Sequence, residues 1–196
     1  MNRRNLASAD TRADSAAMEQ AYQRVLRSGS EGIFDSDRLV WAVQALVSVL
    51  GLLLFSPLLF LIASIIKLTD GGAIFYRGER VGRGKRIFKI YKFRTLVDGA
   101  EKKIGARLLR PADQGVYYTR IGRILKRSKL DELPQLFNVV RGEMRLTGPR
   151  PLRPIFLDQF ERTIPNYSQR FLVPPGITGI AQLRGGYYTS PRDKLR

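Results

Sequence analysis

Two adjacent carboxylates, Asp131 and Glu132, stand in the stretch LKRSKLDELPQLFNVVRGEMRLTGPRP, between flanks that are rich in Arg and Lys. Consecutive residues of a helix point about 100° apart, so this pair is poorly placed to share a proton or to flank one bond as glycosidase carboxylates do. One carboxylate could instead attack an electrophile or take a proton while the other holds a cation. The pair alone does not exclude a simpler alternative, a solvated helix start with Asp131 as its cap and Glu132 in its first turn.

The residues around Asp131 favour a carboxylate that acts on a phosphoryl group. Pro134 is tolerated only in the first turn of a helix, which places Asp131 at or near the N-cap, where backbone N–H groups stabilise negative charge. Lys126, Arg127 and Lys129 add positive potential that should keep the carboxylate ionised. An ionised Asp beside a divalent cation and several Arg residues suits attack on phosphorus.

The composition narrows the chemistry further. The chain of 196 residues has no Cys and no His, which excludes disulfides, thiolate nucleophiles, His-containing metal sites and the commonest general base. Catalysis must therefore use carboxylates, Lys, Arg, Tyr or hydroxyl groups, with or without a hard cation held by oxygen ligands. The formal net charge of +17 implies anionic partners, and nucleic acid, an anionic membrane surface or a phosphorylated substrate would each satisfy it.

A long apolar segment precedes these residues. No charged residue occurs in 39–66, and at about 1.5 Å per residue a helix of this length would extend roughly 40 Å, beyond the ~30 Å hydrocarbon core of a bilayer. We therefore expect this segment to insert into a membrane. Ser56 and Pro57 lie near its middle, so it is either a kinked spanning helix or a re-entrant helix that breaks and returns to the face it entered from. Lys and Arg flank both ends, and from charge alone both alternatives stay open.

The patterns beyond the apolar segment predict a short β-hairpin among helices. RIFKIYKFRT alternates apolar and basic residues, and glycines such as Gly78 supply turns, so residues 71–97 should form the hairpin. Lys92 and Arg94 share one strand face, so both could reach one diphosphate, with lipid head groups as the alternative partner. Short helices are expected over 98–109, 119–126, 132–141 and 155–163, with TGPRPLRP extended and VPPGITGIAQLRGG forming a loop.

These patterns divide the chain into three parts of an α+β fold. Residues 1–37 read as a polar mobile arm with a short helix over 18–27. Residues 38–69 contain the membrane segment. Residues 70–196 form a small, mainly helical domain that carries the hairpin and the two carboxylates.

The motif LDELPQLFNVVRGEMRLTGPRP closely resembles the signature of the bacterial sugar transferases, which are monotopic polyprenyl-phosphate phosphoglycosyl transferases. The resemblance covers about residues 39–196 and keeps the order of that family's landmarks. An apolar segment interrupted by Ser-Pro comes first, then YKFRT, DGAE, the Asp-Glu motif with GPRP, and PPGITGIAQLRGG. The long central motif is highly specific, whereas Ser-Pro or FRT alone would not be.

The resemblance implies a reaction and a location. Such enzymes move a phosphosugar from a UDP-sugar to polyprenyl (undecaprenyl) phosphate and release UMP, the first membrane step of exopolysaccharide or glycoconjugate synthesis. The family's apolar segment is a re-entrant helix-break-helix in the bacterial inner membrane, with the catalytic domain and both termini on the cytoplasmic face. The relevant membrane positions here are Ser56 and Pro57.

The resemblance also implies roles for individual residues. Asp131 matches the nucleophile that forms a covalent phosphosugar intermediate, and Glu132 matches the residue that helps to hold Mg²⁺, with Asp131 as its neighbour in the metal site. Arg150 of the PRP sequence belongs to the substrate-binding site. We assign the substrate-binding site to Lys92, Arg94, Lys126, Arg127, Gln135, Asn138, Pro149, Arg150 and Pro151.

Two features depart from the family pattern. Lys126 stands where the family more often has Arg, so a forked phosphate contact there is reduced to a single-point one. The sequence stops at SPRDKLR, whereas relatives continue into an amphipathic and aromatic stretch. We therefore expect the closing C-terminal element to be truncated and the activity to be less secure than the family assignment.

A function from another class also fits the charge and the apolar segment. A non-catalytic, basic membrane-anchored module could present its surface to anionic lipids without any chemistry. Nucleic acid is disfavoured as a partner, because the chain combines a membrane segment with no recognisable nucleic-acid motif. The sequence leaves open which sugar is carried, which glycan pathway is served and whether the protein forms a homo-oligomer.

Overall fold

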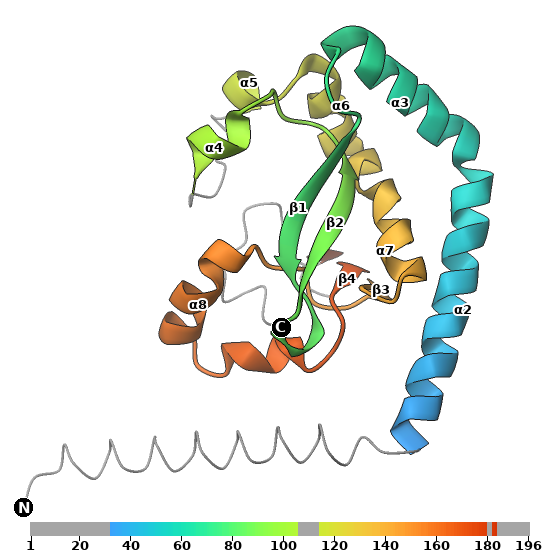
Figure 1. The fold of residues 1–196 in the computed structure, drawn as a ribbon, viewed down its shortest axis with the longest axis vertical. Coiled ribbons are helices and arrows are strands. Elements are labelled where there is room, and N and C mark those ends of the chain that lie inside the picture. Colours follow the sequence, from blue (N-terminus) through green and yellow to red (C-terminus); the bar gives the residue numbers. More distant parts are fainter. Residues whose placement is uncertain (1–31, 106–113, 180–181, 184–196) are drawn as a thin grey trace, which may run out of the picture. The chain divides into compact units, whose positions relative to one another are not determined.

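The apolar segment forms two helices that meet at a break. The computed structural model describes residues 32–105, 114–179 and 182–183. A single residue, Phe55, separates helix α2 (Gly32–Leu54) from helix α3 (Ser56–Asp70) (Figure 1). Pro57 lies in the first turn of α3, where its missing N–H leaves no hydrogen bond unmade. The Ser56 hydroxyl donates to the Leu53 carbonyl at 2.7 Å, which satisfies an acceptor at the end of α2. The predicted interruption at Ser56 and Pro57 is therefore confirmed.

The chain divides into two units, Met1–Val40 and Trp41–Arg196. The predicted mobile arm over residues 1–37, with its short helix over 18–27, lies almost entirely outside the described residues. The predicted truncation of the closing C-terminal element concerns SPRDKLR, and this segment also lies outside the described residues.

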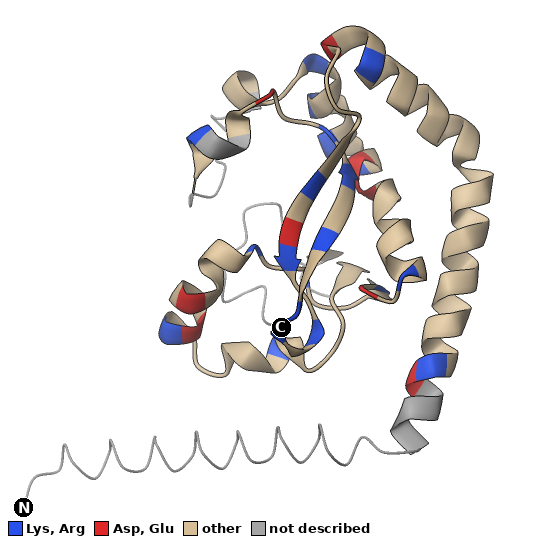
Figure 2. Cartoon of the chain, in the orientation of Figure 1, with Lys and Arg blue, Asp and Glu red and all other residues tan. Residues whose placement is uncertain are grey.

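Most of the surface of the two helices is apolar. Residues Asp37–Leu54 form the one described helix that is long and apolar enough to cross a membrane, with a mean hydropathy of 1.6 and only 6% of the stretch buried. Leu50, Leu54 and Phe60 are among the exposed apolar side chains. In the ribbon of Figure 2 the tan, uncharged stretch runs from the residue after Arg38 through both helices to Lys67 near the end of α3. A core helix of a soluble protein would bury such residues.

From Trp41 onward, where the second unit begins, one side of the two helices packs against the rest of that unit. The Trp41 indole donates to the Val139 carbonyl at 3.0 Å, and the Gln44 amide oxygen accepts from the Leu146 N–H at 2.8 Å. Further along, Ile62 and Ile66 of α3 form a core cluster with Phe93 and Leu125. The apolar segment is thus part of the folded unit and not a separate tether.

The predicted β-hairpin is present. Strands β1 (Phe75–Val81) and β2 (Ile87–Phe93) pair antiparallel through a 3-10 turn, η1 (Arg83–Lys85), with Phe75 opposite Phe93. Gly78 was expected in a turn but lies inside β1. A glycine fits this strand position because the Tyr76 ring occupies the space that a Cβ would fill. Ile90 of β2 is buried in a core cluster with Val139. The fold is mainly helical with a small antiparallel sheet, as predicted.

The remaining elements are short and surround the hairpin. Thr119 caps the predicted helix that follows it, since its hydroxyl accepts from the Gly122 N–H at 2.9 Å. The helix predicted over 132–141 is divided into a 3-10 and an α-helical part, and the one over 98–109 is described only to Ile104. The elements are α4 (Ala100–Ile104), α5 (Gln114–Tyr117), α6 (Arg120–Ser128), η3 (Leu130–Gln135), α7 (Leu136–Val140), β3 (Arg145–Thr147), η4 (Pro154–Phe156), α8 (Leu157–Thr163), η5 (Tyr167–Phe171) and β4 (Gly176–Thr178). Strand β3, directly before GPRP, pairs in parallel with β4, which lies in the VPPGITGIAQLRGG segment where a loop was expected.

Gly122 of α6 and Gly115 of α5 provide a matched test of how closely α6 packs on Thr95, which follows β2. A Cβ added at Gly122 would overlap the Thr95 carbonyl, whereas one at Gly115 in α5 would meet nothing within 4 Å. Gly122→Ala should therefore lower the free energy of unfolding by about 1–3 kcal/mol through overpacking. Gly115→Ala should leave it unchanged or raise it by about 0.5–1 kcal/mol. Denaturant titration of both variants in one detergent measures this, and equal stabilities would contradict the close contact.

Candidate active site

Asp131 and Glu132 lie in η3, between α6 and α7, and both are buried. Lys129 precedes η3 in the left-handed region with φ 62°, and this residue turns the chain out of α6. Asp131 lies within the first turn of η3 and not at its N-cap, since η3 begins at Leu130. Only 1% of Asp131 and 7% of Glu132 are exposed. The alternative of a solvated helix start is therefore wrong.

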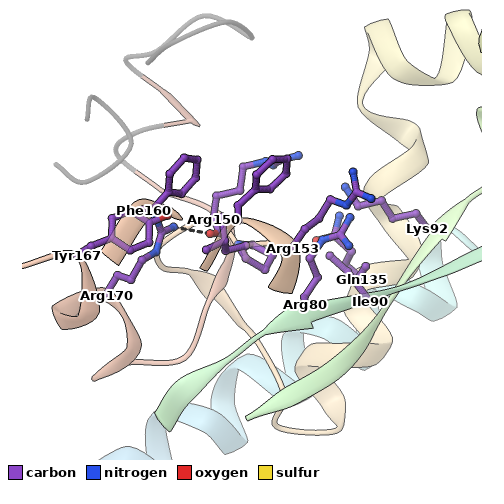
Figure 3. Close-up of a pocket in the computed structure, with 12 residues that line it drawn as sticks. Arg80, Ile90, Lys92, Gln135, Arg150, Arg153, Phe160, Tyr167 and Arg170 are labelled. Atoms are coloured by element: carbon purple, nitrogen blue, oxygen red, sulfur yellow. Dashed lines mark hydrogen bonds between the residues drawn. The ribbon is translucent and has the colours of Figure 1, made fainter. Parts of the chain in front are cut away.

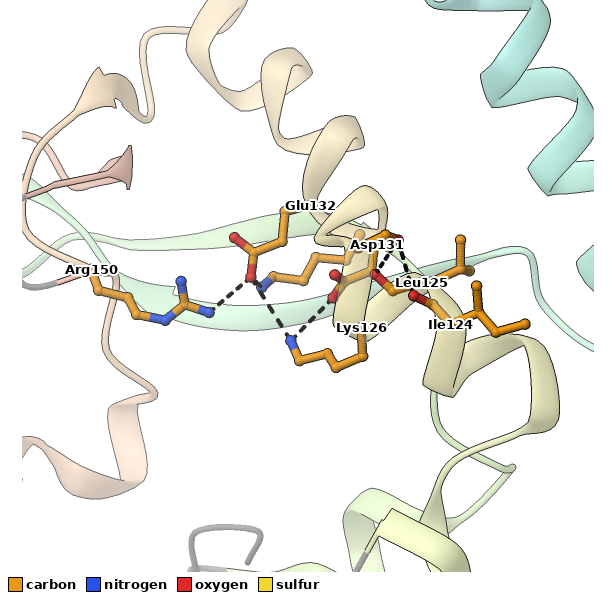
Figure 4. A network of polar contacts seen from close by, with 8 residues as sticks. Ile124, Leu125, Lys126, Asp131, Glu132 and Arg150 are labelled. Carbon is orange, nitrogen blue, oxygen red and sulfur yellow. Dashed lines mark hydrogen bonds and ion pairs between the residues drawn. The ribbon is translucent and has the colours of Figure 1, made fainter. Parts of the chain in front are cut away.

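Three cationic side chains contact the two carboxylates (Figure 4). Lys126 Nζ lies 3.1 Å from Asp131 Oδ2 and 3.8 Å from Glu132 Oε1, so one ammonium links both carboxylates. Lys92 Nζ and Arg150 Nη2 each lie 2.8 Å from Glu132 Oε1. Three cationic and two anionic side chains leave one net positive charge, which favours the approach of an anion.

Burial and charge act on the pKa values of this cluster in opposite directions. Burial lowers the pKa of Lys92 to about 8, helped by the charges of Arg150 and Lys126 and opposed by Glu132. Burial would raise the pKa of Glu132, but Lys92 and Arg150 outweigh it and hold this pKa far below its usual range. Burial also opposes the charge of Arg150, yet Glu132 raises its pKa above the usual value. Glu132 and Arg150 thus stay charged near neutral pH, whereas Lys92 is close to titration.

One carboxylate oxygen of the site has no partner. Asp131 Oδ2 is engaged by Lys126, whereas Asp131 Oδ1 is buried and has no hydrogen-bond partner among the described residues. Buried carboxylate oxygens are usually hydrogen-bonded, and an unpaired one destabilises the fold. An oxygen held in this way is suited to attack an electrophile or to coordinate a cation.

A pocket of about 190 Å³ adjoins the carboxylates. Figure 3 shows Lys92, Gln135 and Ile90 at one end, Arg150 near the middle, and Phe160, Tyr167 and Arg170 at the other. None of the described residues that line it is Asp or Glu, so its charged side chains are all cationic and attract anions. The lining residues are Arg80, Ile90, Lys92, Gln135, Arg150, Pro151, Leu152, Arg153, Phe156, Phe160, Tyr167 and Arg170.

Some residues assigned to the substrate site from the sequence have other roles in the structure. Arg94 is not among the described residues that line the pocket with Lys92; it donates to Asp98 at 2.7 Å and lies 3.6 Å from Asp70, so it links the end of α3 to the hairpin. Arg94 directly follows the end of β2 at Phe93, and its backbone N–H donates to the Ile74 carbonyl at 2.9 Å.

Asn138, Arg127 and Pro149 are also outside the pocket lining. The buried Asn138 amide donates to the Lys89 carbonyl at 2.8 Å and accepts from the Tyr91 N–H at 3.0 Å, which ties α7 to β2. Arg127 is exposed on α6. The Pro149 carbonyl accepts from the Gly176 N–H at 2.9 Å, at the join between β3 and β4. Asn138 and Pro149 thus hold neighbouring segments of the fold together through these hydrogen bonds.

Of the twelve described residues that line the pocket, four were predicted from the sequence, Lys92, Gln135, Arg150 and Pro151, and the others were missed. Arg170 holds Arg150 in place, because its Nη2 donates to the Arg150 carbonyl at 2.6 Å and its Nη1 donates to the Tyr167 hydroxyl at 2.6 Å. Tyr167 belongs to an aromatic row in which Phe156 stacks on Phe160 with centroids 5.7 Å apart. The four-residue spacing of Phe156 and Phe160 was visible in the sequence, but it carries no ligand signature.

The carboxylates fit a magnesium ion only together with a substrate. The described residues contain no group of three side chains that could hold a metal. Mg²⁺, however, is commonly bound by one or two carboxylates plus phosphate oxygens and water. The unpartnered Asp131 Oδ1 and the Glu132 carboxylate supply such a pair. The residues present are therefore compatible with Mg²⁺ that binds with an anionic, phosphate-containing ligand.

Lys92 should make stability depend on pH in a defined window. Its pKa is about 8 in the folded protein against an ordinary value of 10.5, so between these values the unfolded chain binds more protons than the folded one. Lys92 therefore contributes an increase in stability as pH rises from 8 to 10.5. Lys92→Met should lose that contribution. Urea titrations of wild type and variant across this range measure it, and a constant difference between the two would contradict the lowered pKa.

Residues 37–196 match the profile of a family described as bacterial sugar transferase. UDP-N-acetylgalactosamine-undecaprenyl-phosphate N-acetylgalactosaminephosphotransferase of Aeromonas hydrophila is 44% identical over 151 residues, 77% of this chain and 35% of that protein. UDP-glucose:undecaprenyl-phosphate glucose-1-phosphate transferase of Caulobacter vibrioides is 44% identical over 132 residues, 67% of this chain and 48% of that protein.

The match covers a larger share of a third relative than of the first two. Exopolysaccharide production protein ExoY of Sinorhizobium fredii is 34% identical over 154 residues, 72% of this chain and 67% of that protein. The chain thus spans 35% and 48% of the length of the first two relatives and 67% of the third. The similarity extends over the apolar helices, the hairpin and the carboxylate site.

Proposed function

Because the chain belongs to the bacterial sugar transferase family, we propose that it transfers a sugar phosphate from a UDP-sugar to polyprenyl phosphate and releases UMP. Relatives carry the names of undecaprenyl-phosphate sugar phosphotransferases, one for N-acetylgalactosamine and one for glucose. A third relative is named for exopolysaccharide production, which suits a first membrane step in making such a polymer. The observation that carries the proposal is the buried Asp131, with one unpartnered oxygen beside a cluster of cations.

Asp131 is the nucleophile of the first step. Its free carboxylate oxygen attacks the phosphorus that bears the sugar, and a new O–P bond forms. The bond from that phosphorus to the bridging oxygen breaks, and UMP leaves with that oxygen and the electron pair. The product is a phosphosugar linked covalently to Asp131, with no proton removed from the nucleophile.

Polyprenyl phosphate takes the sugar phosphate in the second step. One of its phosphate oxygens attacks the same phosphorus, the bond to Asp131 breaks, and the carboxylate is regenerated. The product is a polyprenyl diphosphate sugar. Because both attacking oxygens are already anionic, neither step requires a general base, which suits a chain without His.

The cationic side chains position the phosphates and neutralise their charge. Lys92 and Arg150, both bound to Glu132, line the pocket where the diphosphate enters. Arg150 lies between Pro149 and Pro151, so its backbone loses little freedom when its planar guanidinium binds phosphate. Lys126 holds Asp131 Oδ2 and directs the other oxygen away from itself. Mg²⁺, held by Asp131 and Glu132, would supply further neutralisation of the departing phosphate.

A UMP-release assay tests the proposed reaction. The purified protein is incubated with a panel of UDP-sugars, polyprenyl phosphate and Mg²⁺. We expect UMP with at least one UDP-sugar, together with a lipid-linked product, and the panel identifies the sugar. Absence of UMP with every sugar, in a protein that unfolds cooperatively, would contradict the proposal and favour a non-catalytic membrane-anchored module.

The membrane segment is proposed to be re-entrant at the cytoplasmic face of the inner membrane. The break between α2 and α3 supports this arrangement, as do the exposed apolar side chains on both helices. Arg38 and Lys67 mark the two ends of the uncharged stretch, and Lys and Arg favour the cytoplasmic side. The anionic lipid surface there would also attract the basic domain.

Cysteine labelling tests this topology, because the chain has no natural Cys. Single substitutions Ser36→Cys and Thr69→Cys place a thiol on each side of the apolar segment. A membrane-impermeant maleimide should label neither thiol in intact cells and both in inverted membrane vesicles. Labelling of one position in intact cells and the other in inverted vesicles would instead establish a spanning helix.

A further inference from the structure

Gln135 is a buried polar residue with an unused donor. It is the last residue of η3, four positions after Asp131, and only 2% of it is exposed. Its Nε2 atom is buried and has no hydrogen-bond partner among the described residues. Unpaired buried amide groups destabilise a fold, and in native proteins they often mark a functional position.

The residue that carries this donor is part of the pocket wall. Gln135 lines the pocket together with Lys92 and Arg150, and Figure 3 shows it beside Lys92 and Ile90. With Arg80, Arg153 and Arg170, the described part of the chain contributes five cationic side chains to this pocket and no Asp or Glu. A ligand that matches these walls carries at least two negative charges and offers acceptor oxygens.

We propose that Gln135 is a substrate-contact residue whose Nε2 donates a hydrogen bond to a phosphate oxygen of the donor diphosphate, next to Lys92 and Arg150. The identity of that ligand as a UDP-sugar rests on the proposed function. A neutral amide suits this position, because it adds a donor without adding charge. A further Lys or Arg beside Lys92 would instead favour loss of the Lys92 proton.

This role predicts opposite effects on stability and on binding. Gln135→Met keeps the approximate size of the side chain and removes the unpaired donor, so the thermal midpoint of the free protein should rise. The same change removes one hydrogen bond to an anion, so the dissociation constant for pyrophosphate should increase about tenfold to a hundredfold. A residue with a purely structural role would lower stability when replaced and leave pyrophosphate binding unchanged.

Gln44 provides the matched structural control. Its amide oxygen accepts from the Leu146 N–H at 2.8 Å, and neither residue is among those that line the pocket. Gln44→Met leaves that N–H without its partner, so the thermal midpoint should fall while the affinity for pyrophosphate stays the same. The two Gln→Met changes thus predict opposite patterns from identical chemistry.

The experiment combines thermal unfolding with calorimetric titration of pyrophosphate on the full chain and both variants. A higher midpoint with weaker binding for Gln135→Met supports the proposal. A lower midpoint with unchanged binding overturns it, and so does an absence of pyrophosphate binding to the wild-type protein. Titration needs no turnover, so these outcomes are independent of UMP release, which tests the proposed function separately.

Discussion

Replacement of Asp131 by Asn is expected to reduce UMP release at least about a thousandfold, since removal of a covalent nucleophile commonly costs this much or more. The amide has nearly the same shape as the carboxylate, but it carries no negative charge and cannot displace UMP. Asp131 is held by one ion pair to Lys126, and Lys126 also lies near Glu132. The fold should therefore tolerate the change.

Asp158→Asn is the control for the loss of a carboxylate. Asp158 is exposed in the first turn of α8 and does not line the pocket. Its replacement should leave UMP release at the wild-type rate. Membrane association should survive in both variants, because it depends on α2 and α3. UMP release by Asp131→Asn at the rate of Asp158→Asn would remove Asp131 from the mechanism.

Glu132→Gln should produce the largest loss of stability among the site variants. The Glu132 carboxylate is the shared partner of Lys92 and Arg150 at 2.8 Å, with Lys126 at 3.8 Å. Without its charge, these cations face one another around a buried amide. Removing one partner of a buried ion pair commonly lowers the free energy of unfolding by about 3–5 kcal/mol. Since Arg150 is partly exposed, we expect about 3 kcal/mol for this variant in a denaturant titration.

A double-mutant cycle separates this repulsion from a loss of packing. Arg150→Met removes one of the cations that Glu132 holds, so the double variant Glu132→Gln with Arg150→Met should be more stable than the sum of the single effects predicts. The coupling should be about 1–3 kcal/mol, as expected for residues in one ion-pair network. Additive effects would show that the ion pair contributes little and that Glu132 acts through packing.

The sequence was sufficient for the parts of the fold that follow local rules. The alternation of RIFKIYKFRT predicted the hairpin, because one strand face packs on the core through residues such as Ile90. Ser56 and Pro57 predicted the helix break, because Pro cannot donate the hydrogen bond of a helix interior. Asp131 and Glu132 stood out because two acidic residues occur among basic ones.

Contacts between distant segments could not be read from the sequence in the same way. Strands β3 and β4 are three residues each, and Arg145 pairs with Gly176 across a long separation that no local pattern reveals. The period of a strand predicts on which face Lys92 and Arg94 lie, but not that Asp98 binds Arg94. The far wall of the pocket comes from aromatic residues of η4, α8 and η5 whose spacing is typical of ordinary packing.

The most direct test of the mechanism is to trap the intermediate on Asp131. The protein is incubated with its UDP-sugar in the absence of polyprenyl phosphate, and the intact mass is measured by mass spectrometry. We predict a mass increase of one phosphosugar, located on the peptide that contains Asp131, absent from Asp131→Asn and discharged when polyprenyl phosphate is added. UMP release that occurs only with polyprenyl phosphate present, with no adduct at any time, would show direct transfer and contradict the account.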